Sequence, residues 1–310
     1  MATVPGATNV VSGLRTQAPA EPFLNTVNAY RISLGLPPVV NDPRLQDGVT
    51  LHARYLALTG SVAHTEAPSN PLYSPAGALA ASQSLVGGWS GRQRSDREFV
   101  EDWLIAPFHA IHLFEPRLQR IALGVSRNEP GAILTEAAVL NVTAGIGPKV
   151  WFDDPIVFPA DGSTVPLSAF RTETPSPLTH CPGYTAPAGL PVIAMFPSSP
   201  ESPTAEMTAD GIPLEVCVID SGYRNPDPNA QQVGHLLLTQ KNAVVVVPRL
   251  PLQVGVLHEV VVRTGRGGTA RWSFRVGAEG SSLPGPSRKP IALRAGPKAP
   301  AKAVGSKKLG

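Results

Sequence analysis

The chain has 310 residues and a net charge of +3, with 42% hydrophobic and 16% charged residues. This length exceeds that of most single domains and allows two hydrophobic cores. Residues 281–310 carry seven basic residues and no acid, which leaves the rest of the chain at a net charge of −4. The high isoelectric point therefore reflects the C-terminal residues, and we expect no nucleic-acid binding by the folded part.

No run of 18 apolar residues is present, so the sequence predicts no transmembrane helix. Residues 1–20 lack the charged and apolar segments of a signal peptide, which taken alone favours the cytoplasm. Residues 279–310, rich in Pro, Gly, Ala and Lys, are predicted to be a disordered basic tail. Binding of this tail to an anionic polymer or a membrane surface stays open.

Helices are predicted for the first part of the chain. Apolar residues recur at helical spacing over 23–34, before Gly35, and again between Asp42-Pro43 and Gly60. Asp42 is suited to cap a helix with Pro at its first position, and Gly60 to end it. Ser95-Asp96-Arg97-Glu98 is a capping-box pattern that begins a third helix. A short helix over 109–114 completes the set.

Strands are predicted for the remainder. Residues 121–125 and 137–142 give an α+β domain that ends near residue 148. After Trp151, β-branched runs alternate with Pro and Gly, and Arg266-Gly267-Gly268 is typical of a hairpin turn. This spacing predicts a β-sandwich, with strands at 192–196, 214–219, 243–247, 256–264 and 270–276. The predicted boundaries are an N-terminal extension (1–20), an α+β domain (21–148), a β-sandwich (149–278) and the tail (279–310).

Five segments in the first part resemble, in order, the bacterial branch of the cysteine-rich secretory protein, antigen 5 and pathogenesis-related 1 (CAP) superfamily. They are Asn25-Thr26-Val27-Asn28-Ala29-Tyr30-Arg31, Gly35-Leu36-Pro37-Pro38-Val39, His64, the run from Trp103 to His109, and residues 121–125. The resemblance covers about residues 22–146. It implies a three-layer αβα sandwich with a shallow cleft that holds two histidines and two acidic residues.

On this resemblance His64 and His109 are the histidine pair. The first acid of the family pattern lies in a Gly-Glu-Asn turn, for which the counterpart here is Ala81-Ser82-Gln83, so Ser82 replaces a carboxylate. The candidates for the second acid are Glu66, Glu98 and Asp102. Glu98 also has a purely structural interpretation as the acid of the capping box.

Three interpretations of this cleft are possible: a zinc site, a hydrolase active site and a polar binding cleft. His64 and His109, with one carboxylate, supply the minimum set of ligands for zinc, and His109 and His112 are spaced to share a metal on one helix. Ser82 with a histidine and Glu66 or Asp102 would satisfy the logic of a hydrolase triad. The third interpretation, a polar cleft without metal or turnover, is the one we favour, because family members resembling this domain bind extracellular, often lipid-like, ligands.

The second part resembles bacterial immunoglobulin-like modules through Pro159-Ala160-Asp161-Gly162 and Trp272-Ser273-Phe274. It contains both cysteines of the chain, Cys181 and Cys217, each beside a predicted strand. A disulfide between them would require an oxidising compartment, and the alternative is two buried free thiols. The resulting hypothesis is a secreted or cell-surface bacterial protein that binds an extracellular small molecule, lipid or cell-envelope ligand. The rival hypothesis is a hydrolase or metal-dependent enzyme.

Overall fold

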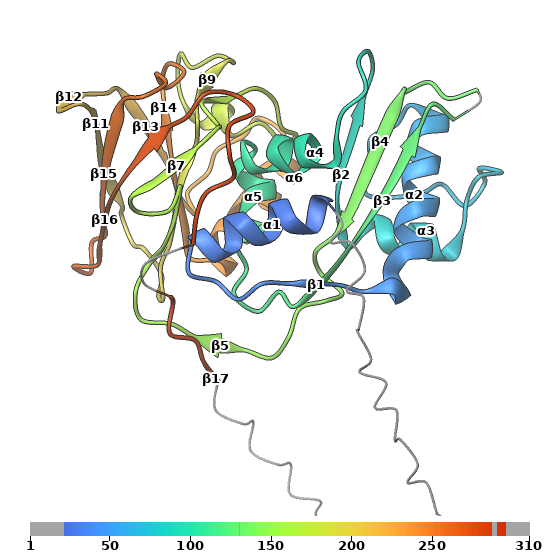
Figure 1. Ribbon diagram of the computed structural model, residues 1–310, viewed down its shortest axis with the longest axis horizontal. Helices are drawn as coiled ribbons and strands as arrows, with labels where there is room; N and C mark the ends of the chain where they lie inside the picture. Colours follow the sequence, from blue (N-terminus) through green and yellow to red (C-terminus); the bar gives the residue numbers. More distant parts are fainter. Residues whose placement is uncertain (1–21, 130, 287–289, 296–310) are drawn as a thin grey trace, which may run out of the picture.

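The computed structural model describes residues 22–129, 131–286 and 290–295, and Figure 1 shows them arranged in layers. Helices α2 (Gln46–Thr59) and α3 (Pro75–Ala81) cover one face of a sheet with the order β1 (Val40–Asn41), β3 (Arg120–Arg127), β4 (Glu136–Asn141), β2 (Ser84–Trp89). Helices α1 (Pro22–Ser33), α4 (Asp96–Leu104) and α5 (Pro107–Leu113) lie on its other face.

Strand β4 lies in the middle of this αβα arrangement and is buried along its whole length. Because side chains alternate across a strand, its residues divide between two hydrophobic clusters. Ala137 and Val139 pack with α2, whereas Ala138 and Leu140 pack in the cluster that contains α1, α4 and α5. The two clusters account for the three layers that the family resemblance implies.

The helix ends follow the capping signals in the sequence. The Asp42 side chain accepts a hydrogen bond from the Arg44 backbone at the start of the 3-10 helix η1 (Pro43–Leu45), and α2 continues to Gly60, whose φ is +69°. Ser95 and Glu98 form both hydrogen bonds of the capping box at the start of α4. The short helix α5 begins at Pro107, two residues earlier than predicted, because the proline occupies its first position.

The second part contains two further sheets, seen at the left of Figure 1. One has the order β13 (Val216–Ile219), β14 (Ala243–Pro248), β10 (Val192–Met195), β6 (Ile156–Phe158). The other has the order β12 (Ile212–Pro213), β11 (Thr204–Ala209), β15 (Leu257–Arg263), β16 (Thr269–Val276), β7 (Ser163–Val165). Short pairs complete it: β8 (Ala169–Phe170) with β9 (Ala188–Gly189), and β5 (Val150–Trp151) with β17 (Arg294–Ala295). The 3-10 helix η2 (Pro177–His180) follows β8.

This part is not all-β, contrary to the sequence-based expectation, because it contains the helix α6 (Pro228–Gln240). Asp227 caps α6 and Pro228 occupies its first turn, the same pair of signals that begins the 3-10 turn before α2. Helix α6 packs on β14, and α5 packs on β10. Strand β14 is buried along its whole length, which explains its uninterrupted apolar sequence.

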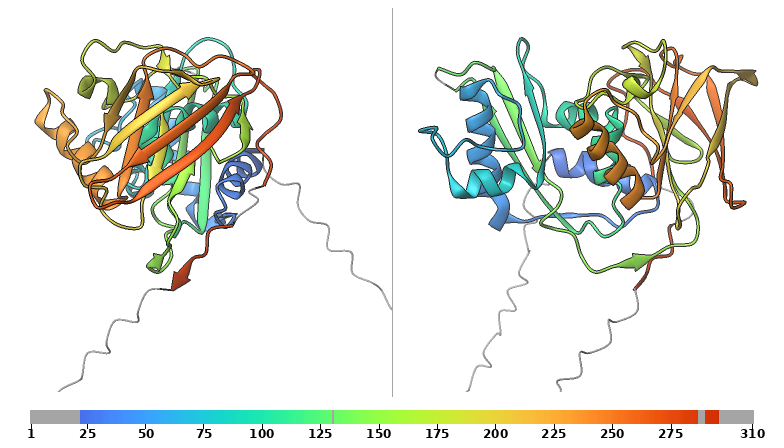
Figure 2. Two further views of the ribbon diagram at one scale, coloured as in Figure 1. Left: turned by 90° about the vertical axis from the view of Figure 1, so that its left-hand side faces the viewer. Right: turned by 180° about the vertical axis from the view of Figure 1, so that it is seen from behind.

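The two parts of the chain share one hydrophobic core. Phe114, which follows α5, packs on Phe158 of β6 with ring centroids 4.8 Å apart. Phe108 of α5 meets Tyr223 edge-on at 5.2 Å. At the edge of this contact, the Lys241 ammonium forms an ion pair with the buried Glu115 carboxylate. The right-hand view of Figure 2 shows α5 and α6 between the first sheet and the β-sandwich.

Cys181 and Cys217 form a disulfide, which confirms the first of the two interpretations of these cysteines. The bond joins the residue after η2 to β13, 36 positions apart. On the chain-entropy model a disulfide that closes a loop of this length stabilises the folded state by about 3–4 kcal/mol.

Part of the predicted tail lies on the body of the protein. The Ile291 N–H donates to the Gly35 carbonyl at 2.9 Å, and β17 pairs with β5. The predicted extension at residues 1–20 and the last residues of the predicted tail, 296–310, lie outside the described residues. Among the described residues, no helix is long and apolar enough to cross a membrane.

Candidate functional site

A cleft of about 280 Å³ lies where the first part of the chain meets the second. The structure brings His64, His109 and Ser82 together in its wall and adds His112 to them. The second part contributes the segment Thr174-Pro175 and two residues of α6, Val233 and Leu237. We call this site the interdomain cleft. The two imidazoles that the sequence singles out, 45 positions apart, therefore face the same space.

His64 lies in the loop that follows α2. Its Nδ1 is 3.3 Å from the Ala81 carbonyl oxygen, which ties the loop to the end of α3. Burial of the ring lowers its pKa, and the nearby histidines His109 and His52 act in the same direction. His64 is consequently a neutral imidazole at pH 7 and can donate or accept a hydrogen bond in the cleft.

Glu66 does not line the interdomain cleft, although it is only two positions from His64. Its carboxylate is fully buried, accepts a hydrogen bond from the Ser74 backbone at 2.9 Å, and lies 3.0 Å from His52 Nδ1. The other nitrogen of His52 is 2.9 Å from the Ala63 carbonyl oxygen. The buried His52–Glu66 pair thus holds the loop that carries His64 against α2. Glu66 therefore positions this loop and does not contact the interdomain cleft.

The carboxylate partner of His109 is Glu173, a residue that the sequence analysis does not identify. Glu173 comes from the second part of the chain, between β8 and η2, and its side chain is fully buried. Its carboxylate is hydrogen-bonded to His109 Nδ1 and accepts hydrogen bonds from the backbone N–H groups of His109, at 2.8 Å, and Phe108, at 3.2 Å. Because Nδ1 is engaged, Nε2 is the nitrogen of His109 available to a ligand.

No local pattern could have revealed Glu173. It is 64 positions from His109 and belongs to a segment whose sequence predicts a loop in a separate module. The family pattern places an acid at the position of Ser82, and the first part of the chain has no carboxylate there. Glu173 of the second part provides a carboxylate to the histidine site instead.

Two serines at the end of α3 and the start of β2 line the cleft. The Ser82 hydroxyl donates to the Leu79 carbonyl at 2.9 Å, within its own turn. The Ser84 hydroxyl is buried and has no hydrogen-bond partner among the described residues. A buried hydroxyl without a partner costs free energy, which a ligand that bonds to it would recover. Ser84 is therefore a stronger candidate for ligand contact than Ser82.

The other two acidic candidates belong to α4 and line a different surface pocket. Glu98 is the capping-box acid, as its structural interpretation proposes, and also pairs with Arg92. Asp102 pairs with Arg94 at 3.3 Å. Neither residue lines the interdomain cleft.

The donor set does not fit a zinc site. Structural and catalytic zinc sites use at least three protein ligands. Within the described ranges, no group of three or more His, Cys, Asp or Glu side chains is placed to hold a metal ion. The nearest carboxylate, Glu173, already bonds to His109 and two backbone N–H groups, and Glu66 bonds to His52. We therefore derive no chemistry of this cleft from zinc.

His112 makes the stability of the protein depend on pH. Burial, together with the charges of Lys241 and His109, lowers its pKa to about 4. An unfolded chain has a histidine pKa near 6.5, so it binds more protons than the folded state between pH 4 and 6.5. Stability is complete above pH 6.5 and declines as the pH falls through this window, by up to about 3 kcal/mol.

The measurement is the free energy of unfolding in urea at pH 7.5, 6.5, 5.5 and 4.5 for the parent and for His112→Gln. The variant should show a smaller loss of stability between pH 6.5 and 4.5, whatever its stability at pH 7.5. Glu115, whose pKa is lowered to about 2 by hydrogen bonds from Arg117 and Lys241 despite its burial, contributes mainly at lower pH. If the free energy of unfolding falls equally with pH in both proteins, His112 is not the source of the pH dependence.

The comparisons with known proteins give one informative match. A sequence comparison with curated proteins finds no match. Among solved structures, the copper resistance protein PcoC from Escherichia coli aligns at 14% identity over 40% of this chain and 97% of its own, with a TM-score of 0.22. A TM-score this low carries no argument about fold or function. The family model described as "CAP: Cysteine-rich secretory protein family" matches residues 24–141, which supports the assignment of the αβα domain to the CAP superfamily.

Proposed function

We propose that the protein is a secreted or cell-surface binding protein whose interdomain cleft holds a small extracellular ligand with an apolar, lipid-like portion. The observation that carries the proposal is the mixed wall of the cleft. Phe108, Val233 and Leu237 supply apolar surface, and imidazoles and hydroxyls lie alongside it. A pocket that is mainly apolar with a few polar groups is typical of small-molecule sites.

The hydrogen bonds of the cleft favour binding over turnover. A serine nucleophile needs a hydrogen bond to its general base. The Ser82 hydroxyl donates to the backbone of its own turn, and the Ser84 hydroxyl bonds to neither imidazole. We expect the polar end of the ligand to bond to these hydroxyls and to His64.

The extracellular location rests on two observations. The disulfide between Cys181 and Cys217 is of a kind that persists in oxidising compartments. The family matched by residues 24–141 is described as that of cysteine-rich secretory proteins. We expect the ligand to come from the surroundings of the cell or from its envelope.

A hydrolase is the second candidate, and the Glu173–His109 pair favours it. A carboxylate bonded to Nδ1 fixes the ring and its tautomer, which is the role of the acid in a catalytic triad. His109 Nε2 could then act as a general base toward a water molecule. Such a hydrolase would use the same cleft. Its activity would require His109, whereas ligand binding requires the apolar wall of the cleft.

The test is a fluorescence titration with 11-(dansylamino)undecanoic acid. The parent should bind this probe saturably, and Val233→Asp should weaken binding by at least about tenfold, because it places a charge in the apolar wall. The matched control is Leu236→Asp on the same helix, since Leu236 is 50% exposed, Val233 is 52% exposed, and only Val233 lines the cleft. The control should bind as the parent does.

Absence of saturable binding, or equal loss in both variants, would overturn the binding proposal. The rival is tested with p-nitrophenyl acetate. Saturable hydrolysis by the parent that His109→Ala abolishes, and that Val233→Asp leaves intact, would identify the protein as a hydrolase instead.

A further inference from the structure

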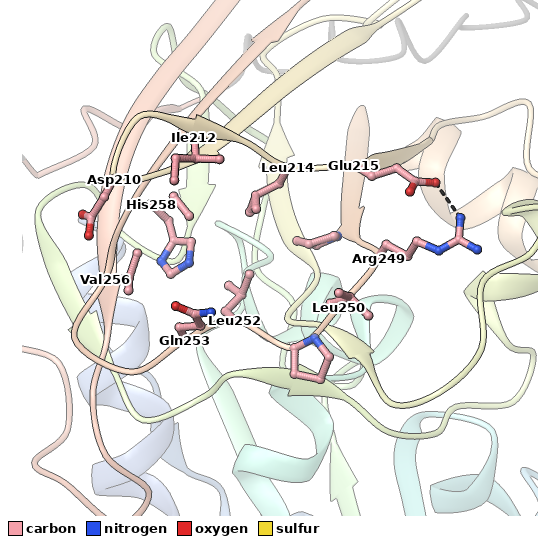
Figure 3. Close-up of a pocket in the computed structure, with 13 residues that line it drawn as sticks. Asp210, Ile212, Leu214, Glu215, Arg249, Leu250, Leu252, Gln253, Val256 and His258 are labelled. Atoms are coloured by element: carbon pink, nitrogen blue, oxygen red, sulfur yellow. Dashed lines mark hydrogen bonds and ion pairs between the residues drawn. The ribbon is translucent and has the colours of Figure 1, made fainter.

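A second pocket, of about 380 Å³, opens at one end of the β-sandwich, in the part of the chain that the CAP family model does not match. Figure 3 shows Ile212 and Leu214 on one side of it and Leu250 and Leu252 on the other, with the ring of His258 between them. We call it the sandwich pocket. None of its residues lines the interdomain cleft.

His258 is the polar group at the base of this pocket. It is 1% exposed and belongs to β15, where it lies opposite Ala209 of β11. Its ring stacks on Phe274 of the neighbouring strand, with centroids 5.3 Å apart and an angle of 21° between the planes. The ring is therefore held in place by the sheet rather than by a ligand.

The Nδ1 atom of His258 is buried without a hydrogen-bond partner among the described residues. Buried polar atoms in folded proteins are nearly always paired, so an unpaired one in a pocket wall needs an explanation. Burial also lowers the pKa of this histidine, so the ring is neutral at pH 7. A neutral imidazole nitrogen in an apolar pocket can form one hydrogen bond with a ligand.

The charged groups of the pocket determine which ligand charge it accepts. Glu215 pairs with Arg249 at 2.6 Å, as the dashed line in Figure 3 marks. Asp210 accepts a hydrogen bond from the Leu257 backbone at 3.0 Å and has no paired cation in the pocket wall. The rim is thus net negative, which disfavours an anionic ligand.

We infer that the sandwich pocket is a second ligand site, which takes a small neutral molecule with an apolar body and one hydrogen-bonding group that bonds to His258 Nδ1. Two exposed apolar side chains border its mouth, Ile212 at 69% and Leu250 at 73% exposure. An apolar ligand would cover them and would bury its own surface against Leu214 and Leu252. This site is independent of the function proposed for the interdomain cleft.

The test uses the full chain and the neutral fluorescent probe N-phenyl-1-naphthylamine. The parent should bind the probe saturably, and Ile212→Asp and Leu250→Asp should each weaken binding by at least about tenfold. Both side chains are exposed, so neither substitution disrupts the core. The control is Leu79→Asp, because Leu79 is 59% exposed and lines neither pocket. Val233→Asp, which alters the interdomain cleft, should retain the binding that the sandwich-pocket variants lose.

The hydrogen bond is tested by displacement of the probe. 1-Octanol should displace it at a concentration about fivefold lower than 1-chlorooctane, which has a similar apolar body but no hydroxyl. His258→Phe keeps a ring that can stack on Phe274 and should abolish this preference. Binding that survives both Ile212→Asp and Leu250→Asp, or that only Val233→Asp removes, would overturn the proposal. Equal displacement by the two competitors would contradict the part assigned to His258.

Discussion

Replacement of Arg31 by methionine should destabilise the protein by at least about 3 kcal/mol, because four backbone carbonyls would lose their donor. Arg31 is 0% exposed. Its guanidinium donates to the carbonyls of Leu113 at 2.6 Å, Glu115 at 3.1 Å, Leu118 at 3.2 Å and Pro37 at 3.0 Å. Burial lowers its pKa to about 10, so it remains protonated at pH 7.

The measurement is the urea midpoint of Arg31→Met at pH 7.5. The control is Arg54→Met, which removes a partly exposed ion pair with Glu129 and should cost at most about 1 kcal/mol. Similar losses in the two variants would show that the carbonyls find other donors. Arg31→Lys should recover little stability. The guanidinium of arginine donates from three separate nitrogens, whereas the single ammonium of lysine cannot reach all four carbonyls.

Replacement of Gly124 by alanine should have a comparable effect, about 3 kcal/mol or more, through crowding. A Cβ atom at this position of β3 would lie 2.3 Å from the backbone carbonyl carbon and oxygen of Val49. Both partners belong to regular elements, α2 and β3, so neither can move without separating the helix from the sheet. Because α2 also carries His52, the change should loosen the loop that holds His64.

The matched control is Gly285→Ala, where no atom lies within 4 Å of the added Cβ. The free energies of unfolding of the two variants should therefore differ by most of the predicted effect. A Gly124→Ala protein as stable as the control would mean that the helix and the sheet are less closely packed than the structure indicates.

The sequence predicts the local features of this protein well. Asp42-Pro43, Gly60 and the capping box at Ser95 each act within one helical turn, and each lies at a helix boundary in the structure. The strands with strong apolar patterns are found near the predicted positions. The family resemblance adds the αβα arrangement, which the alternation of β4 between two clusters bears out.

The missed features have different physical reasons. Strand β2 contains Gly87 and Gly88, which weaken a strand pattern, and the Asp-Pro signal of α6 lies between strong β runs that obscure it. Glu173 could not be found because its role depends on packing between segments distant in sequence. The same holds for His258, whose unpaired nitrogen is visible only once β11, β15 and β16 are assembled.

The buried contact of Phe114 with Phe158, and of Phe108 with Tyr223, has a consequence for how this chain can be divided. A fragment that stops near residue 148 would expose these aromatic rings to water and leave His109 without its carboxylate. We therefore expect residues 22–148 to be unstable when separated from the second part, and the contact between His109 and Glu173 to form only when both parts of the chain are folded together.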